Sequence, residues 1–253
     1  MRPAGRRRLR HLALILGLVA VAGSGGCERS SEHAKAPGVA ANEYFPLVAG
    51  AHWRYKLALE IGSGEVEIVG RGDSAVEGLP GVAFIMDEHA LNADALGIVE
   101  VGPTAYVARD GFLCRYTGLD YRSEKELRML GGEDPARVMP LGAMPGAEWT
   151  NETRLLEQPD NGGGKVIKWT GRTKHVPELV VPAGSFQDVL LVETEYWDRA
   201  VNPDAPLLAY HDFYARGVGL LRSVTMNMRD GGAQMVEQTL LDFDFPRERA
   251  QND

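Results

Sequence analysis

The 253-residue chain carries 35 Asp and Glu against 27 Lys and Arg, a net charge of −8, and two cysteines, Cys27 and Cys114. An acidic surface repels phosphate backbones, so the composition argues against a nucleic-acid partner. The length is sufficient for one sizeable domain with its own core.

The first 26 residues have the three zones of a secretory signal. A head with five arginines precedes an apolar stretch from Leu12 to Ala22, and Gly23–Gly26 are small. The apolar stretch is too short to cross a bilayer of about 30 Å at about 1.5 Å per helical residue. We therefore expect residues 1–26 to be removed, which would leave 22 basic against 35 acidic side chains, a net charge of −13.

The residues Ser24-Gly25-Gly26-Cys27 resemble the lipobox of bacterial lipoproteins, in which the cysteine is acylated and becomes the first residue. Several acyl chains anchor a protein stably, whereas one holds it only marginally. Because Glu28 is not the Asp that resembles an inner-membrane retention signal, we expect anchoring at the outer membrane, facing the periplasm. Plain secretion with an incidental cysteine, and export through the Arg6-Arg7 pair, are the alternatives.

Three segments follow the predicted signal. Residues 27–42 are small, polar and aperiodic, which is typical of a flexible tether, and residues 248–253 form a polar tail. Residues 43–247 are predicted to be a single β-domain. With Cys27 acylated, Cys114 has no disulfide partner and is expected to be an ordinary strand residue.

Apolar and polar residues alternate from His52 to Ile61, which indicates a half-buried strand. Asp110-Gly111, between two β-rich arms, predicts a hairpin. The period is lost between Leu119 and Pro145, where Arg122–Leu130 is expected to form at most one short helix. Further apolar runs bring the total to about ten to twelve strands. The predicted fold is mainly β: a curved antiparallel sheet, as a half-barrel, barrel or sandwich meander, with at most one or two short helices.

A repeated sequence motif suggests two related halves, which start near residues 45 and 139. Phe45–Tyr55 reads FPLVAGAHWRY and Met139–Thr150 reads MPLGAMPGAEWT. In each copy Pro fixes an extended entry, Gly permits a bend and Trp opens a strand on the buried face. Each copy is therefore expected to start a segment of sheet.

Three stretches together resemble a family of uncharacterised bacterial envelope proteins, whose members are exported proteins and lipoproteins. They are YFPLVAGAHWRY, from Tyr44, VPAGSFQDVLLVE, from Val181, and FYARGVGLLRSV, from Phe213. The resemblance implies a curved antiparallel sheet and brings no activity with it. Where that family often has a cysteine, this chain has Asp188-Val189.

Familiar catalytic motifs are missing from the sequence, and we expect no cofactor and no metal site. One polar cluster could supply an acid/base pair for a hydrolase, on strands 192–198 and 210–214. Its members are Glu193, Glu195, His211 and Asp212. Alternation places Glu193 and Glu195 on one face and turns His211 and Asp212 in opposite directions, so a solvated acidic face is the simpler interpretation.

Several aromatic side chains lie on predicted strands, where they could line a cavity in a curved sheet or fill its core. The candidates for ligand lining are Trp53, Tyr55, Trp149, Trp169, Tyr196 and Tyr210. The leading hypothesis is a non-enzymatic, lipid-anchored binding or assembly module of the bacterial envelope that contacts the membrane through Cys27. Its ligand or partner would be an envelope protein or an apolar molecule, and a carrier of apolar ligands and a hydrolase are the alternatives.

Overall fold

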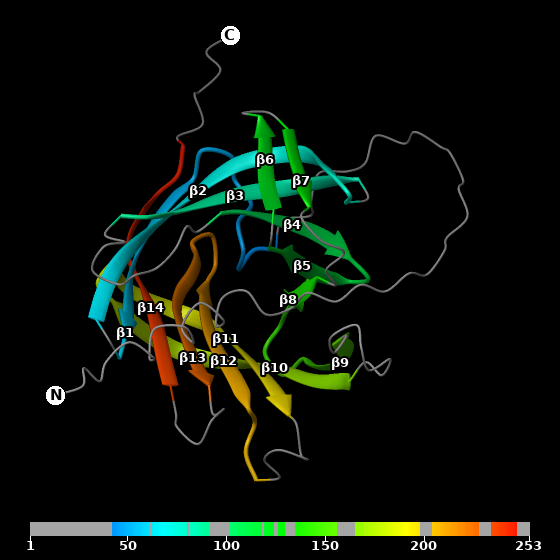
Figure 1. Ribbon diagram of the computed structural model, residues 1–253. Helices are drawn as coiled ribbons and strands as arrows, with labels where there is room; N and C mark the ends of the chain where they lie inside the picture. Colours follow the sequence, from blue (N-terminus) through cyan, green and yellow to red (C-terminus); the bar gives the residue numbers. More distant parts are fainter. Residues whose placement is uncertain are drawn as a thin grey trace, which may run out of the picture.

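The computed structural model describes residues 42–60, 62–79, 81–91, 102–117, 119–123, 126–129, 135–155, 165–197, 204–227 and 234–246. These residues form 14 strands (Figure 1). The strands are β1 (His52–Leu59), β2 (Gly62–Glu77), β3 (Val82–Ala90), β4 (Pro103–Arg109), β5 (Phe112–Tyr116), β6 (Leu119–Ser123), β7 (Glu126–Met129), β8 (Ala136–Pro140), β9 (Glu148–Leu155), β10 (Lys165–Val181), β11 (Gly184–Trp197), β12 (Leu208–Ala215), β13 (Gly219–Asn227) and β14 (Gln234–Asp244).

The strands build one curved sheet in the order β8-β5-β4-β3-β2-β1-β14-β13-β12-β11-β10-β9. Neighbours along this path are antiparallel, which confirms the predicted curved antiparallel sheet. The sheet is not closed, because β8 and β9 at its two ends are not paired with each other. The described residues contain no helix, and so none that could span a membrane.

The sequence allows at most one short helix within 122–130, and the described residues of this range lie in strands instead. There β6 and β7 form an antiparallel pair that lies over the outer face of β2–β4 (Figure 1), and β7 pairs in parallel with β2. Leu119 and Leu127 are buried in a second core under this pair, with Cys114 and Ile85. This tertiary packing outweighs the helical propensity of Glu, Lys and Leu.

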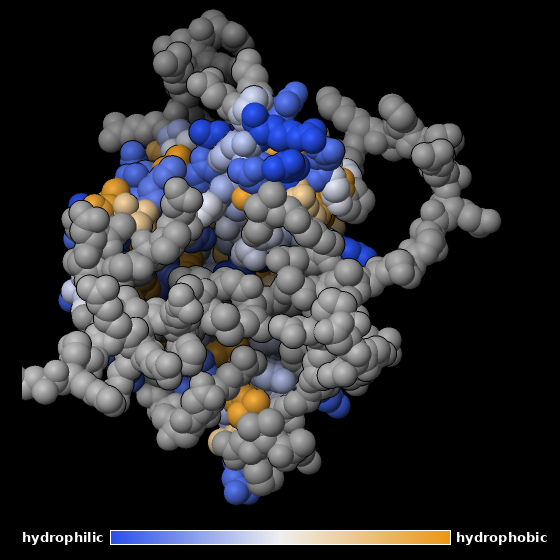
Figure 2. Space-filling model, viewed as in Figure 1, coloured by the Kyte–Doolittle hydropathy of each residue, from blue (hydrophilic) through white to orange (hydrophobic). Residues whose placement is uncertain are grey.

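The outer side of the β6–β7 pair is strongly hydrophilic (Figure 2). Arg122 pairs with Glu77 on β2 at 2.8 Å, and Arg128 pairs with Asp120 at 3.2 Å. The two strands therefore cover apolar surface beneath them and present charges to water.

The β4–β5 hairpin turns at Asp110-Gly111, as the sequence predicts. Both residues have positive φ, 51° and 78°, which matches a tight turn whose twist suits the flanking strands. Cys114 lies buried in β5, which confirms it as a strand residue.

The three stretches that resemble the envelope family meet in space. Trp53 donates its indole N–H to the carbonyl of Val218 at 2.7 Å, and the Tyr55 hydroxyl donates to the carbonyl of Leu220 at 3.0 Å. Gly219 has a φ of 99°, and a Cβ there would lie 3.4 Å from Pro46. The positive φ, and not this ordinary van der Waals distance, explains why a glycine suits the position.

The third stretch joins the same region from the β10–β11 hairpin. Its turn, Pro182-Ala183, docks on β14, where the amide of Ala183 donates to the carbonyl of Leu240 at 3.3 Å. The ring of Phe186 lies 6.3 Å from that of Phe243. The three motifs thus contribute to one apolar core.

The two copies of the repeated motif each lead into a strand, β1 and β9, as expected. Their tryptophans differ in surroundings. Trp53 is buried at 3% exposure, whereas Trp149 is half-buried and lies flat over Gly171, where a Cβ would be 2.0 Å from the indole. The division of the chain into a signal, a tether and two related halves stays a prediction.

Candidate functional site in the lumen of the sheet

The concave side of the sheet encloses a lumen whose walls come from strands far apart in the sheet. Phe45 bridges two walls, with its ring 4.9 Å from Tyr106 on β4 and 6.0 Å from Tyr214 on β12. Five strands lie between β4 and β12 in the sheet order. The inner faces of the strands therefore curve around a common interior.

One end of this lumen is closed by the N-terminal segment. The Asn42 amide donates to the carbonyls of Pro140 and Leu141 at 3.1 and 3.2 Å. The main core, which includes Phe45, fills the space beside it. The side chains of this core that are at most 1% exposed are Ala51, Leu113, Met139, Val189, Leu190, Val192, Leu221 and Leu240.

Charged side chains break the apolar inner face farther along the lumen. We call Glu88 on β3, Arg115 on β5 and Asp212 on β12 the inner cluster. Arg115 interacts electrostatically with both carboxyl groups, although six strands separate β5 from β12 in the sheet order. Arg115 is exposed to solvent and lines a cavity in the lumen.

Each carboxyl group of the inner cluster has one hydroxyl partner. The Thr104 hydroxyl donates to Glu88, and the Ser223 hydroxyl donates to Asp212 at 2.5 Å. Arg115 also hydrogen-bonds the Tyr106 hydroxyl. An ionised carboxylate can accept about four hydrogen bonds, so both groups keep accepting capacity.

Burial among the surrounding strands shifts these groups towards their neutral forms. Burial raises the pKa of Glu88, with Arg115 and Thr104 acting against the shift, and it raises the pKa of Asp212, with Ser223 and Arg115 opposing. Burial also raises the pKa of Tyr106 to about 12. Placing ionisable groups on this face therefore costs free energy of folding.

A cavity of about 80 Å³ opens between the apolar end of the lumen and the inner cluster. Glu88 and Arg115 contribute its charged atoms, and Trp53, Tyr55 and Tyr106 contribute aromatic walls. The remaining lining residues are Phe45, Pro46, Ile68, Met86, Gly219, Leu220 and Gln238.

The six aromatic residues predicted to line a ligand occupy three separate places. Trp53 and Tyr55 line the cavity, and Trp149 lies near the sheet edge, 6.0 Å from Phe112 between ring centroids. Trp169 stacks with Tyr196 and Tyr210, at centroid distances of 5.1 and 6.5 Å. The structure thus places only two of the six at the cavity, and ligand lining stays a prediction for all of them.

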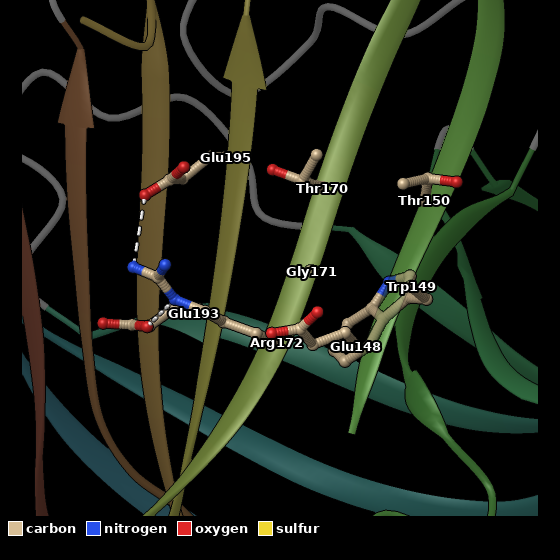
Figure 3. Close-up of a pocket in the computed structure, with 8 residues that line it drawn as sticks. All are labelled: Glu148, Trp149, Thr150, Thr170, Gly171, Arg172, Glu193 and Glu195. Atoms are coloured by element: carbon tan, nitrogen blue, oxygen red, sulfur yellow. Dashed lines mark hydrogen bonds and ion pairs between the residues drawn. The ribbon is translucent and has the colours of Figure 1, made fainter. Parts of the chain in front are cut away.

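The predicted acidic cluster divides between the two faces. Glu193 and His211 are cross-strand neighbours on the outer face, with 4.0 Å between Oε1 and Nε2, while Asp212 points into the lumen. Glu193 is 8% exposed because Arg172 and Lys174 cover it, with Lys174 Nζ 2.8 Å from Oε2. Arg172 also lies 3.6 Å from Glu195 (Figure 3).

We call Arg172, Lys174 and Glu193 the outer cluster. Burial acts to raise the pKa of Glu193, but hydrogen bonds from Lys174 and Arg172 outweigh it and hold the pKa below its ordinary value. A depression of about 510 Å³ lies beside this cluster (Figure 3), lined by Glu148, Trp149, Thr150, Thr170, Gly171, Arg172, Glu193 and Glu195.

Sequence reasoning missed Glu88 and Arg115. The available signal was alternation, because Glu88 follows the inward Met86, and Arg115 follows the inward Leu113, by two residues. Within the strands and turns that the structure describes, no three His, Cys, Asp or Glu side chains gather as metal ligands would. Cys27 lies outside the described residues.

A comparison of the sequence with protein families finds no matching family, and a comparison with curated proteins finds no match. Among solved structures, one provisionally described as a lipoprotein, from Parabacteroides distasonis, is 14% identical, with a TM-score of 0.41. One provisionally described as an exported protein with a YmcC-like fold, from Bacteroides fragilis, is 13% identical, with a TM-score of 0.40. Each alignment covers 79% of this chain and 98% of the other.

A third solved structure is provisionally described as an outer membrane lipoprotein-sorting protein domain, from Vibrio parahaemolyticus. It is 11% identical, with a TM-score of 0.26, and the alignment covers 80% of this chain and 88% of that one.

Proposed function

We propose that the protein is a non-enzymatic, lipid-anchored binding module of the bacterial envelope, held at the outer membrane through acylated Cys27. Its binding site is the open part of the lumen. The observation that carries this proposal is the inner cluster, where Glu88, Arg115 and Asp212 stand on the same face as the main core. Charged groups on such a face oppose folding, which is typical of functional positions.

A carrier of apolar molecules fits the lumen less well. Cavities that hold drug-sized ligands have about 300 to 1,000 Å³, whereas the cavity here has about 80 Å³. Phe45 and its neighbours occupy the apolar end where an acyl chain would have to lie. The size and charge of the cavity favour a small polar group instead.

A hydrolase on the outer face is also less well supported. Glu193 is engaged by two cationic side chains, and the depression of its pKa makes it a poor proton donor. Asp212, the other acid of the predicted cluster, is on the opposite face. The outer cluster is better explained as an ion-pair network that stabilises the strand pair.

Anchoring is tested by the Cys27→Ser variant, followed by membrane fractionation and intact-mass measurement of the natural protein. We expect wild-type protein in the outer-membrane fraction with the mass of an acylated chain, and the variant in the soluble fraction. A variant that stays in the membrane pellet, or a natural protein with an unmodified thiol, would show that Cys27 is not the anchor.

Binding in the lumen is tested by native mass spectrometry of full-length protein extracted in a mild detergent. We expect a retained adduct on wild-type protein and on Glu237→Gln, a control on the outer face of β14. The adduct should be lost from the Glu88→Gln, Arg115→Gln double variant, whose folding is checked by circular dichroism. Equal adducts on all three proteins, or none on wild type, would contradict the proposal.

A further inference from the structure

The charges of the inner cluster do not balance. Arg115 interacts electrostatically with both Glu88 on β3 and Asp212 on β12, and it is the one cationic member of the inner cluster, although His211 also acts on Asp212. When both are ionised, the cluster has one more negative than positive charge. A cationic group would bring it to neutrality, whereas an anionic group would add to the excess.

The cavity also suits a cation in shape and chemistry. Glu88 lies on its wall with Trp53, Tyr55 and Tyr106, and the faces of aromatic rings attract cations. Arg115 also lines the cavity and competes with a cationic guest for Glu88, while Asp212 does not line it and acts on Arg115 electrostatically. Glu88 is therefore the carboxylate available to a guest. At about 30 Å³ for a water molecule in the liquid, about 80 Å³ gives room for a small head group.

We propose that the cavity binds a primary ammonium group, held by the Glu88 carboxylate and the surrounding aromatic rings. This inference rests on the proposed binding function and specifies its ligand class. The ammonium belongs either to a free small amine or to the ethanolamine head group of a lipid, since both present the same chemistry. The capacity of Glu88 to accept further hydrogen bonds and the excess negative charge are the two features that select it.

The experiment uses full-length protein in a non-ionic detergent, with ethylammonium chloride as the probe and sodium acetate as its anionic counterpart. Saturation-transfer NMR at constant ionic strength and about pH 8, above the usual carboxyl pKa, follows binding. A probe this small is expected to bind in about the millimolar range. Glu88→Gln should weaken ethylammonium binding at least about tenfold, as the loss of a charged hydrogen bond would.

Two further variants separate this mechanism from a general charge effect. Glu237→Gln removes a carboxylate from the outer face of β14, where it pairs with Arg222 at 2.9 Å, and should leave binding unchanged. Arg115→Gln removes a competing cation from the cavity wall and should tighten ethylammonium binding. Acetate binding that depends on Arg115, equal effects of the two Glu variants, or no ethylammonium binding would overturn the proposal.

Competition with lipid micelles distinguishes a free amine from a lipid head group as the source of the ammonium. Mixed micelles that contain phosphatidylethanolamine displace ethylammonium if the site takes a lipid head group, and micelles with phosphatidylglycerol do not. Lack of displacement by either lipid assigns the site to a free amine. If ethylammonium fails to bind while the native mass spectra still show an adduct that the Glu88→Gln, Arg115→Gln double variant loses, only the ligand class is refuted and the binding function stands.

Discussion

The sheet carries two charged clusters on opposite faces, the outer cluster on β10 and β11 and the inner cluster on β3, β5 and β12. The clusters differ in how their charges are paired. On the outer face, one carboxylate, Glu193, receives two cations. On the inner face, one cation, Arg115, serves two carboxyl groups. The pKa of Glu193 is accordingly lowered, whereas burial raises the pKa values of Glu88 and Asp212.

This contrast separates a structural network from a candidate site. A carboxylate with a lowered pKa contributes stability, because its charged form is better satisfied in the folded state. A carboxyl group with a raised pKa costs stability at neutral pH. Carboxyl groups that outnumber their cationic partners are thus found on the inner face, where a ligand could pair with them, and not on the outer face.

The largest difference in unfolding free energy between substitutions on the two faces is expected for two adjacent leucines of β11. Leu190 is fully buried in the main core, while Leu191 is half-buried on the outer face. Leu190→Ala should lower the free energy of unfolding by about 2 to 5 kcal/mol, measured by urea denaturation. Leu191→Ala is the matched control and should cost clearly less. Equal losses would mean that the two faces are packed alike.

A smaller loss is expected at Gly171, where the inner face of β10 meets Trp149. A Cβ would lie 2.0 Å from the indole, so Gly171→Ala must displace the ring. Overpacking of this kind costs about 1 to 3 kcal/mol. Thr170→Ala, the neighbouring position on the outer face, is the control. Thermal unfolding that leaves both variants at the wild-type midpoint would show that the indole moves freely.

The sequence predicted the parts of this comparison that depend on local pattern. Alternation along residues 192–198 and 210–214 placed Glu193 and Glu195 on one face and turned His211 and Asp212 in opposite directions. Asp110-Gly111 predicted the turn between β4 and β5. The sequence could not show that Arg115 and Asp212 interact electrostatically across the lumen, because their proximity depends on the curvature of the whole sheet. The same limit explains why strands, and not the short helix that the sequence allows, lie within 122–130, where packing of Leu127 in the second core decides the structure.

Through the outer cluster, the free energy of unfolding should fall as the solution becomes acidic, as is usual for paired carboxylates. The pKa of Glu193 is lower in the folded state than in the unfolded state. The stability that its ion pairs contribute is therefore fully present above the unfolded-state pKa and is lost as the pH falls through the folded-state pKa. Glu193→Gln should cost about 1 kcal/mol at neutral pH, a modest loss since Arg172 and Lys174 are half exposed. In urea titrations, the difference from wild type should vanish in acid. A difference that persists there would point to lost packing.

The effect of Glu88 on stability should depend on pH in the opposite direction. Its substitution should change the free energy of unfolding least among these variants. Its folded pKa is raised, so the folded state binds a proton more readily than the unfolded state, and wild-type stability rises as the pH falls through the folded pKa. The groups that face Glu88 are Arg115, Thr104, Tyr55 and Tyr106. Glu88→Gln should therefore gain about 1 kcal/mol or less at neutral pH, because it removes a buried charge but also the attraction to Arg115.

The gain from Glu88→Gln should shrink as the pH is lowered, since wild-type Glu88 then becomes neutral as well. Urea denaturation of both proteins across the acidic range measures this convergence, and Glu237→Gln on the outer face serves as the comparison. A variant that is less stable than wild type at neutral pH would mean that Arg115 already satisfies Glu88. The inner cluster would then be a structural ion pair like the outer one, with no spare charge for an ammonium ligand.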